Sequence, residues 1–251
     1  MAEKPARRQQ KSAGAKLRPF WILIALLVIA VAVGAYYAAT WPGFYPKRVS
    51  VVGNRAVASS EILARAAIVR TQNLWLQSAI RAERRIETIP DVRTASVRRT
   101  LPANVTIDVT ERIPYARVRT PSGTAVVDSA LRVLDGTLPP ASAPLPVFVT
   151  SNAENLEPGH FLAGERLRQL RADYERLRKA ALPVRQMSLD KFGGLVATLP
   201  GNVAILFGED SDLEKKASLV DPILSQLGQH HRAISALDLR APSTPVVVYK
   251  K

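Results

Sequence analysis

The sequence predicts an α+β protein with a single N-terminal transmembrane helix, a small β-α-α-β-β module, and a mostly antiparallel β domain with two packed helices. Three observations support this prediction. Residues 20–39 are apolar and carry no charge, and residues 48–111 hold one strand pattern, two helix patterns and two more strand patterns. The remaining residues place short apolar strands and tight turns around two longer amphipathic helices.

The apolar run is the first element. Residues 20–40 are long enough to cross a bilayer as a helix, and residues 1–19 form a basic tail before it. A cleaved signal peptide is the main alternative, but its apolar core is usually only about 7–15 residues long. The length of this run and the aromatic residues at both of its ends favour a retained anchor. Because basic flanks favour the cytoplasm, we expect a cytoplasmic N-terminus and an extracytoplasmic bulk.

The module follows in five expected elements. The first is a strand at Arg48–Val52 that ends in a Gly53-Asn54 turn. The next is a helix opened by Ser59-Ser60-Glu61, where a serine hydroxyl can cap it. A second helix is expected over Leu74–Ile89, with Leu76, Ile80 and Ile86 on one broad apolar face. Two strands complete the module, Val92–Arg99 and Asn104–Glu111, and the second alternates apolar and polar residues.

The second domain is expected to contain nine strands and two helices. The helices are predicted at Gly164–Leu182 and at about Ser211–Leu227, each with one apolar stripe. The strands are predicted at Tyr115–Arg119, Thr124–Val127, Leu131–Leu134, Val147–Val149, Gln186–Asp190, Leu195–Leu199, Val203–Phe207, Ala236–Arg240 and Thr244–Lys250.

Charge and composition exclude several classes of function. The formal net charge is +14, and the chain has no cysteine, which excludes disulfides, thiolate nucleophiles and Cys-ligated zinc. An outward-facing basic surface favours anionic lipid, acidic envelope polymer or acidic partners. The basic residues follow no recognition-helix or base-stacking pattern, so we expect no nucleic-acid binding.

The sequence carries no recognisable catalytic constellation. The common hydrolase, nucleotide-binding and metalloprotease motifs are absent, and the three histidines, His160, His230 and His231, do not have the spacing of a metal site. We therefore expect no catalytic residues, no cofactor and no metal. This favours a binding or scaffolding protein over an enzyme.

The order of parts resembles the FtsQ/DivIB family of bacterial cell-division proteins. Val49–Asn54 followed by Ser59–Ile62 is similar to the opening of a POTRA domain, and Ile89–Val92, Val97–Pro102 and Val105–Pro114 are similar to its strand hairpin and exit. Leu206–Gly208, Leu213–Lys216 and Leu237–Arg240 resemble the family's late strand, last helix and closing strands. The resemblance places a POTRA domain at residues 45–113 and an FtsQ-type β domain at residues 114–251.

The resemblance implies a non-enzymatic scaffold of the division machinery, located in the inner membrane at the septum. It implies that the β domain binds FtsB- and FtsL-like single-span proteins, while the POTRA domain contacts other division proteins. We expect the FtsB- and FtsL-like partner to add a strand beside the last strand of the sheet. The residues predicted to bind it are Ser243, Thr244, Val246, Val247, Val248 and Tyr249.

Pro245 departs from the family pattern, and it restricts how that partner can pair because proline has no N–H to donate. Two alternatives stay open. One is a POTRA-containing secretion or envelope-assembly component, although the second domain is too small and too helical for a membrane barrel. The other is an anchored cell-wall enzyme, for which Asp128, Asp135 and Asp190 are the acids to replace.

Overall fold

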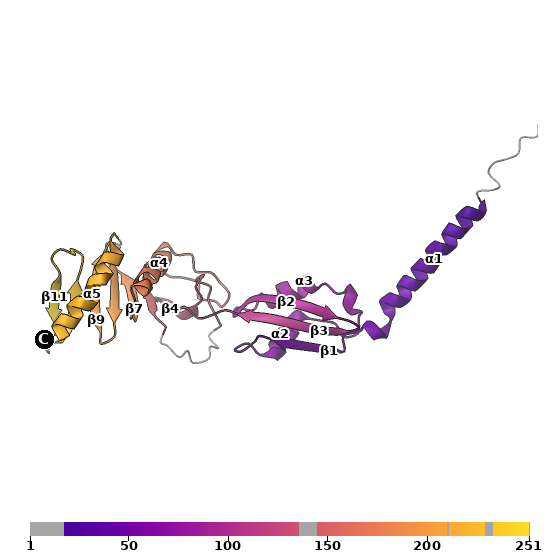
Figure 1. Ribbon diagram of the computed structural model, residues 1–251, viewed down its shortest axis with the longest axis horizontal. Helices are drawn as coiled ribbons and strands as arrows, with labels where there is room; N and C mark the ends of the chain where they lie inside the picture. The colour runs from indigo at the N-terminus through magenta and orange to yellow at the C-terminus, as the bar shows by residue number, and fades with distance from the viewer. Residues whose placement is uncertain (1–17, 136–144, 210, 229–232, 251) are drawn as a thin grey trace, which may run out of the picture.

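The computed structural model describes residues 18–135, 145–209, 211–228 and 233–250. Helix α1 (Arg18–Thr40) stands apart from the folded domains (Figure 1). Its most apolar 18 residues have a mean hydropathy of 2.5, and none of them is buried within the protein. The helix therefore fits a membrane anchor, as the sequence predicts.

A short elbow joins α1 to the first sheet. It consists of the 3-10 helix η2 (Pro42–Phe44), in which the Phe44 ring packs edge-on against Trp41 with ring centroids 5.0 Å apart. The Tyr45 hydroxyl donates to Thr40 O at 3.3 Å. These contacts give the exit from α1 a defined path, which brings the chain directly to the first strand of the module.

The first sheet has three strands in the order β1-β3-β2. Strand β1 (Arg48–Val52) runs parallel to β3 (Asn104–Glu111), and β2 (Val92–Thr100) runs antiparallel to it. Val105, Ile107 and Val109 are buried, which confirms the predicted alternation of β3. Together with residues from the two helices they form a separate core.

The helices of this module differ from the prediction in two ways. Helix α2 (Ser59–Ala66) has Ala58 at its N-cap, and the Ser59 hydroxyl instead accepts a hydrogen bond from Asn54 Nδ2, so the predicted serine cap is wrong. The expected long second helix is broken into the 3-10 turn η3 (Leu74–Leu76) and α3 (Ala79–Ile86). Ser78 caps α3 by accepting from Arg81 N at 3.3 Å, which separates the two pieces.

The break also changes which residues are buried. Ile86 is buried as predicted, but Leu76 and Ile80 are 71% and 61% exposed, so the expected shared apolar face is wrong. Leu76 belongs to the 3-10 turn rather than to α3, and therefore does not follow the helical periodicity on which the prediction depends.

Glu111 ties the end of β3 to the loop after β1. Its carboxylate accepts hydrogen bonds from the backbone N–H groups of Arg55, Ala56 and Val57 at 2.8–3.0 Å. Burial alone would raise the pKa of Glu111, but these three donors hold it below its ordinary value. The loop starts at Gly53, whose φ of +87° and close approach to Val109 O leave no room for a Cβ atom.

The second sheet has eight strands in the order β11-β10-β9-β8-β7-β6-β4-β5. Four neighbouring pairs are antiparallel and three are parallel, so the sheet is mostly antiparallel, as predicted. The parallel pairs join strands that are distant in the sequence, so no local sequence pattern predicts them. The strands are β4 (Ala116–Thr120), β5 (Gly123–Val127), β6 (Val147–Val149), β7 (Gln186–Leu189), β8 (Leu195–Leu199), β9 (Val203–Gly208), β10 (Ile234–Asp238) and β11 (Val246–Tyr249).

One predicted strand does not form. Residues 131–134 make only isolated bridges, such as Val127 with Val133, so the predicted strand at Leu131–Leu134 is wrong. The two predicted helices are α4 (Glu165–Lys179) and α5 (Leu213–Gly228), and both lie across the same face of the sheet (Figure 1). Leu167, Leu170 and Leu177 of α4 are buried in the core between the helices and the strands.

A buried ion pair connects the two domains. Arg112 Nη1 lies 2.6 Å from Asp128 Oδ2, and the side chains are only 12% and 8% exposed. Arg112 also donates through Nε to Val92 O at 3.1 Å, and Asp135 N donates to Asp91 Oδ1 at 3.0 Å. These contacts join the end of the first module to the β4–β5 region of the second sheet.

Candidate partner-binding site

The candidate site is the last strand of the second sheet. Strand β11 pairs antiparallel with β10 and forms one end of the sheet, at the opposite end of the molecule from α1 (Figure 1). Thr244 N donates to Ala241 O at 3.1 Å in the turn that precedes it. An end strand of this kind presents backbone groups that another strand can pair with.

The strand is shorter than expected. It begins at Val246, so the prediction that it starts at Thr244 is wrong: Ser243 and Thr244 lie in the turn. The structure therefore brings four of the six predicted residues, Val246 to Tyr249, together on one strand. Pro245 explains the late start, because it stands between the turn and the first paired residue.

The backbone of β11 alternates between the sheet and its outer edge. Lys250 N donates to Ala233 O at 2.8 Å, and Val248 O accepts from Ser235 Oγ at 3.0 Å. Both groups therefore face β10. Because successive residues direct their backbone groups to opposite sides of a strand, Pro245 and Val247 direct theirs to the outer edge. The missing N–H of Pro245 consequently costs the sheet no hydrogen bond.

The side chains of β11 divide between two faces. Val247 packs against the core of the domain, whereas Val246 and Val248 are 56% and 48% exposed on the other face. Tyr249 alternates to the same side as Val247 and is 40% exposed. Among the described residues, the outer edge thus combines the outward-facing backbone of Val247 with exposed apolar side chains, a combination suited to receiving an extended apolar segment.

An ion pair lies where β10 ends and the connection to β11 begins. Arg240 Nη2 lies 2.5 Å from Asp238 Oδ2, and hydrogen bonding to this guanidinium lowers the pKa of Asp238. Asp238 is the residue opposite Val246 in the ladder. The contact therefore lies within the end of β10 and the first residues of the connection, beside the position where β11 begins.

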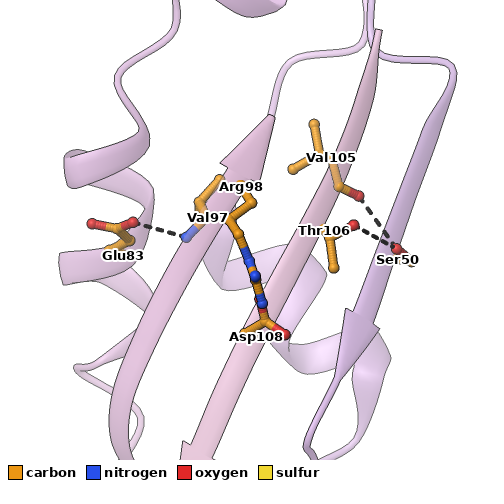
Figure 2. Close-up of polar contacts among 7 residues, drawn as sticks. All are labelled: Ser50, Glu83, Val97, Arg98, Val105, Thr106 and Asp108. Carbon is orange, nitrogen blue, oxygen red and sulfur yellow. Dashed lines mark hydrogen bonds and ion pairs between the residues drawn. The ribbon is translucent and has the colours of Figure 1, made fainter. Parts of the chain in front are cut away.

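Strand β2, at the end of the first sheet, contrasts with β11. Glu83 of α3 accepts a hydrogen bond from Val97 N at 2.8 Å, as Figure 2 shows, and Glu87 accepts one from Ala95 N at 3.1 Å. Both N–H groups belong to the outward-facing set of β2, so two carboxylates occupy the positions that a partner strand would need. Toward its neighbour β3, the same figure shows Arg98 of β2 paired with Asp108 of β3.

The acids considered for catalysis have structural contacts. Asp128 pairs with Arg112 and accepts from Ala130 N and Arg132 N, and Asp190 accepts from Phe192 N and Gly194 N. Within the described residues, no group of three or more histidine, aspartate or glutamate residues is arranged to hold a metal. His160 lies 3.3 Å from Glu157, while His230, His231 and residues 1–17 of the basic tail lie outside the described residues.

Sequence reasoning missed the side chains that decide which edges are accessible. Glu83 and Glu87 have the spacing of an ordinary solvated helix face, and only the packing of α3 beside β2 gives them their backbone partners. The sequence around Ser235 gave no signal either. Ser235 lies where the pairing register of β10 with β11 shifts by one residue. No local signal in the sequence identifies any of these three.

Two family models match the chain in succession. The POTRA domain, FtsQ-type, matches residues 44–112, and the C-terminal domain of cell division protein FtsQ/DivIB matches residues 116–240. The second match ends before β11. The candidate site is therefore outside the region that the family model describes.

Three curated relatives carry the name cell division protein FtsQ. The chain is 28% identical to that of Corynebacterium glutamicum over 119 residues, which are 47% of this chain and 54% of the relative. It is 32% identical to that of Myxococcus fulvus over 115 residues (46% and 40%), and 40% identical to that of Syntrophotalea carbinolica over 76 residues (30% and 27%). The chain thus spans about half or less of the curated relatives that it matches.

Proposed function

The chain belongs to the FtsQ/DivIB family of bacterial cell-division proteins, and we propose that within division it acts as a non-enzymatic scaffold whose β11 edge receives a strand from an FtsB- or FtsL-like protein. The observation that carries this proposal is the exposed outer edge of β11, with Val247 backbone groups directed outward and Val246 and Val248 exposed beside them. A partner strand gains main-chain hydrogen bonds there, each worth about 0.5–1.5 kcal/mol net.

The apolar helix and the family together indicate a single-pass membrane protein of the division site. We propose that α1 is retained as an anchor, with the basic tail in the cytoplasm and both domains outside it. In this orientation the POTRA domain lies next to the membrane, where it contacts other division proteins. The β11 edge then lies farther out, at the end of the second domain.

The non-enzymatic part of the proposal is supported by the contacts of the candidate acids. Asp128 and Asp190 direct their oxygens at backbone N–H groups and at Arg112, so replacing them would disturb folding whether or not the protein is an enzyme. Asp135 is exposed and is the informative acid. We expect Asp135→Asn to support division in cells that depend on it, whereas loss of division with normal protein levels would favour the enzyme alternative.

The experiment that tests the partner site is a binding assay with the full chain in detergent or nanodiscs. The probes are the purified extracytoplasmic segments of the FtsB- and FtsL-like proteins of the same cell. We expect a chain truncated after Pro245, which lacks β11, to lose binding. Circular dichroism and thermal unfolding show whether the truncated chain is folded.

A point variant covers the case in which the truncation disturbs β10. Val248→Glu places a charge on an exposed side chain of the edge strand, and Phe192→Glu places the same charge on a side chain that is 85% exposed in the β7–β8 loop. We expect only Val248→Glu to weaken binding. Unchanged binding by both the folded truncation and Val248→Glu would contradict the β11 site.

A further inference from the structure

Three segments meet at the end of the POTRA domain nearest to α1. They are the elbow, the loop that contains η3, and the turn between β2 and β3, here called the membrane-proximal end and defined as residues 41–48, 67–81 and 98–104 (Figure 1). Asn73 joins this end to the helix, because its side-chain Nδ2 donates to Ala38 O at 3.1 Å and to Ala39 O at 3.2 Å. Carbonyl groups in the last turn of a helix have no partner within the helix, so Asn73 caps α1.

The membrane-proximal end exposes large apolar side chains. Leu76, Leu101 and Ile80 are 71%, 68% and 61% exposed, and Trp75 is 40% exposed. An open hollow of about 520 Å³, lined by the last turns of α1 together with Phe44, Trp75, Leu76 and Leu101, connects three of these side chains to the anchor. A contiguous exposed apolar patch of this kind indicates an interaction site.

All charged residues at the membrane-proximal end are basic. Its three segments carry six basic residues and no acidic one: Lys47, Arg48, Arg70, Arg81, Arg98 and Arg99. Arg98 is paired with Asp108, and Arg99 lies over the Trp75 ring at 5.3 Å. Arg70 and Arg81 are exposed beside the apolar residues. Apolar side chains surrounded by basic ones are typical of surfaces that bind anionic lipid.

The position of the patch identifies a bilayer as the occupant. α1 fits a membrane-spanning helix that ends at Thr40, and Asn73 contacts its last turn directly, so the patch lies at the level where that helix leaves the hydrocarbon. Trp75 is held in place by a hydrogen bond from Nε1 to Pro102 O at 3.4 Å. An indole with an apolar body and a satisfied polar edge suits this interface.

We propose that the membrane-proximal end docks on the surface of the bilayer that holds α1, with Leu76 and Leu101 inserted at the headgroup–acyl boundary and Arg70 and Arg81 on the headgroups of anionic phospholipids. The docking holds the POTRA domain against the membrane and gives the chain a fixed orientation. It also explains why Leu76 and Ile80 are exposed where an apolar helix face was expected.

The absence of cysteine from the chain allows a direct test. Single cysteines are introduced as Leu76→Cys, Phe192→Cys and Val31→Cys, labelled with the fluorophore NBD, and the full chains are placed in nanodiscs of phosphatidylglycerol and phosphatidylcholine. Part of the phosphatidylcholine carries a spin label on its acyl chain, which quenches NBD on contact. Position 31 lies in α1 and reports insertion of the anchor, and position 192 reports the distant domain.

We expect the label at position 76 to lose most of its fluorescence, as at position 31, and the label at position 192 to keep it. A quenched position 31 with an unquenched position 76 would overturn the docking while leaving the anchor intact. In that case the patch would not contact lipid, and a partner protein would be the alternative occupant. An unquenched position 31 would show that α1 does not span, and would overturn both the docking and the membrane anchor on which it rests.

Charge reversal tests the lipid specificity. Arg70→Glu with Arg81→Glu in the Leu76→Cys chain should reduce the quenching at position 76 in anionic nanodiscs. The matched control, Arg93→Glu with Arg119→Glu, makes the same change in charge at exposed positions outside the membrane-proximal end and should leave the quenching unchanged. Equal quenching in both double variants, or equal quenching in nanodiscs without phosphatidylglycerol, would contradict the role given to anionic headgroups.

Discussion

Strands β2 and β11 are both end strands, but they treat their outer edges differently. β2 has outward N–H groups at Ala95 and Val97, and α3 covers them with Glu87 and Glu83. β11 directs the backbone of Val247 outward beside exposed valines, and α5 lies over the face of the sheet rather than over this edge. The difference teaches that the packing of neighbouring side chains decides whether the outer edge of an end strand is covered, as in β2, or is left for the proposed partner, as at Val247 of β11.

The strongest test of this comparison changes one backbone donor of β11. Val247→Pro removes an outward N–H and places the proline ring where a partner strand would lie, while the inward pairs with β10 are retained. We expect partner affinity to fall by about 100-fold, equivalent to ~3 kcal/mol. Isothermal titration calorimetry with the FtsB- or FtsL-like segment measures it.

Val247→Ala is the matched control for that change. It removes the same apolar packing against the domain core but keeps the N–H group. We expect it to retain most of the affinity. If alanine and proline weaken binding equally, the side chain rather than the edge backbone makes the contact.

The second prediction opens the covered edge. Glu83→Ala leaves Val97 N without its acceptor, and hydrogen bonds to charged groups contribute more than neutral ones, so we expect a loss of roughly 1.5 kcal/mol in the free energy of unfolding. Chemical denaturation measures it, and hydrogen exchange should show faster exchange at Val97. Glu83→Gln keeps an acceptor oxygen and should lose less. Unchanged exchange at Val97 in the alanine variant would show that Glu83 does not cover the edge.

The smallest effect concerns the acid sensitivity of the POTRA domain. Five backbone N–H groups of this domain donate to the carboxylates of Glu83, Glu87 and Glu111. The pKa of Glu111 is lowered from 4.5 because hydrogen bonds from the loop outweigh the effect of burial. A carboxyl whose pKa is lowered on folding stabilises the protein above its unfolded pKa. That stabilisation is lost as the pH falls below 4.5 and through the folded value.

We therefore expect unfolding measured at stepwise lower pH to show a smaller loss of stability in Glu111→Gln than in the unaltered chain. Asp135→Asn serves as the control, because no hydrogen bond to that carboxylate is known in the described residues. The account of Glu111 fails if the acid dependence of the two variants is the same.

Local patterns predicted most elements. They failed where two local signals compete and where contacts between distant segments decide the structure. The alternation of Val105, Ile107 and Val109 is a property of β3 itself, and burial confirms it. The break between η3 and α3 depends on the Ser78 cap, which competes with a continuous helical pattern. The covering of β2 depends on the hydrogen bond from Val97 N to Glu83, which lies 14 residues earlier in the chain. That contact forms only because α3 packs beside β2.

The candidate site was predictable in kind and less so in detail. An apolar strand near the end of the chain, with Pro245 before it, indicates an edge. The hydrogen bonds of Ser235 and Lys250 define which residues of β11 face outward, and they come from segments outside the strand. Ser243 and Thr244 lie in a turn because Pro245 delays the start of β11 and Thr244 N donates to Ala241 O.

The most direct test of the central claim is hydrogen exchange, followed by mass spectrometry, on the full chain in nanodiscs with and without the FtsB- or FtsL-like segment. The account predicts that the partner slows exchange in the peptide that contains Val246 to Tyr249, while the peptide that contains Ala95 and Val97 exchanges at the same rate in both states. Protection confined to the POTRA domain, with β11 unchanged in a complex shown to have formed, would contradict it.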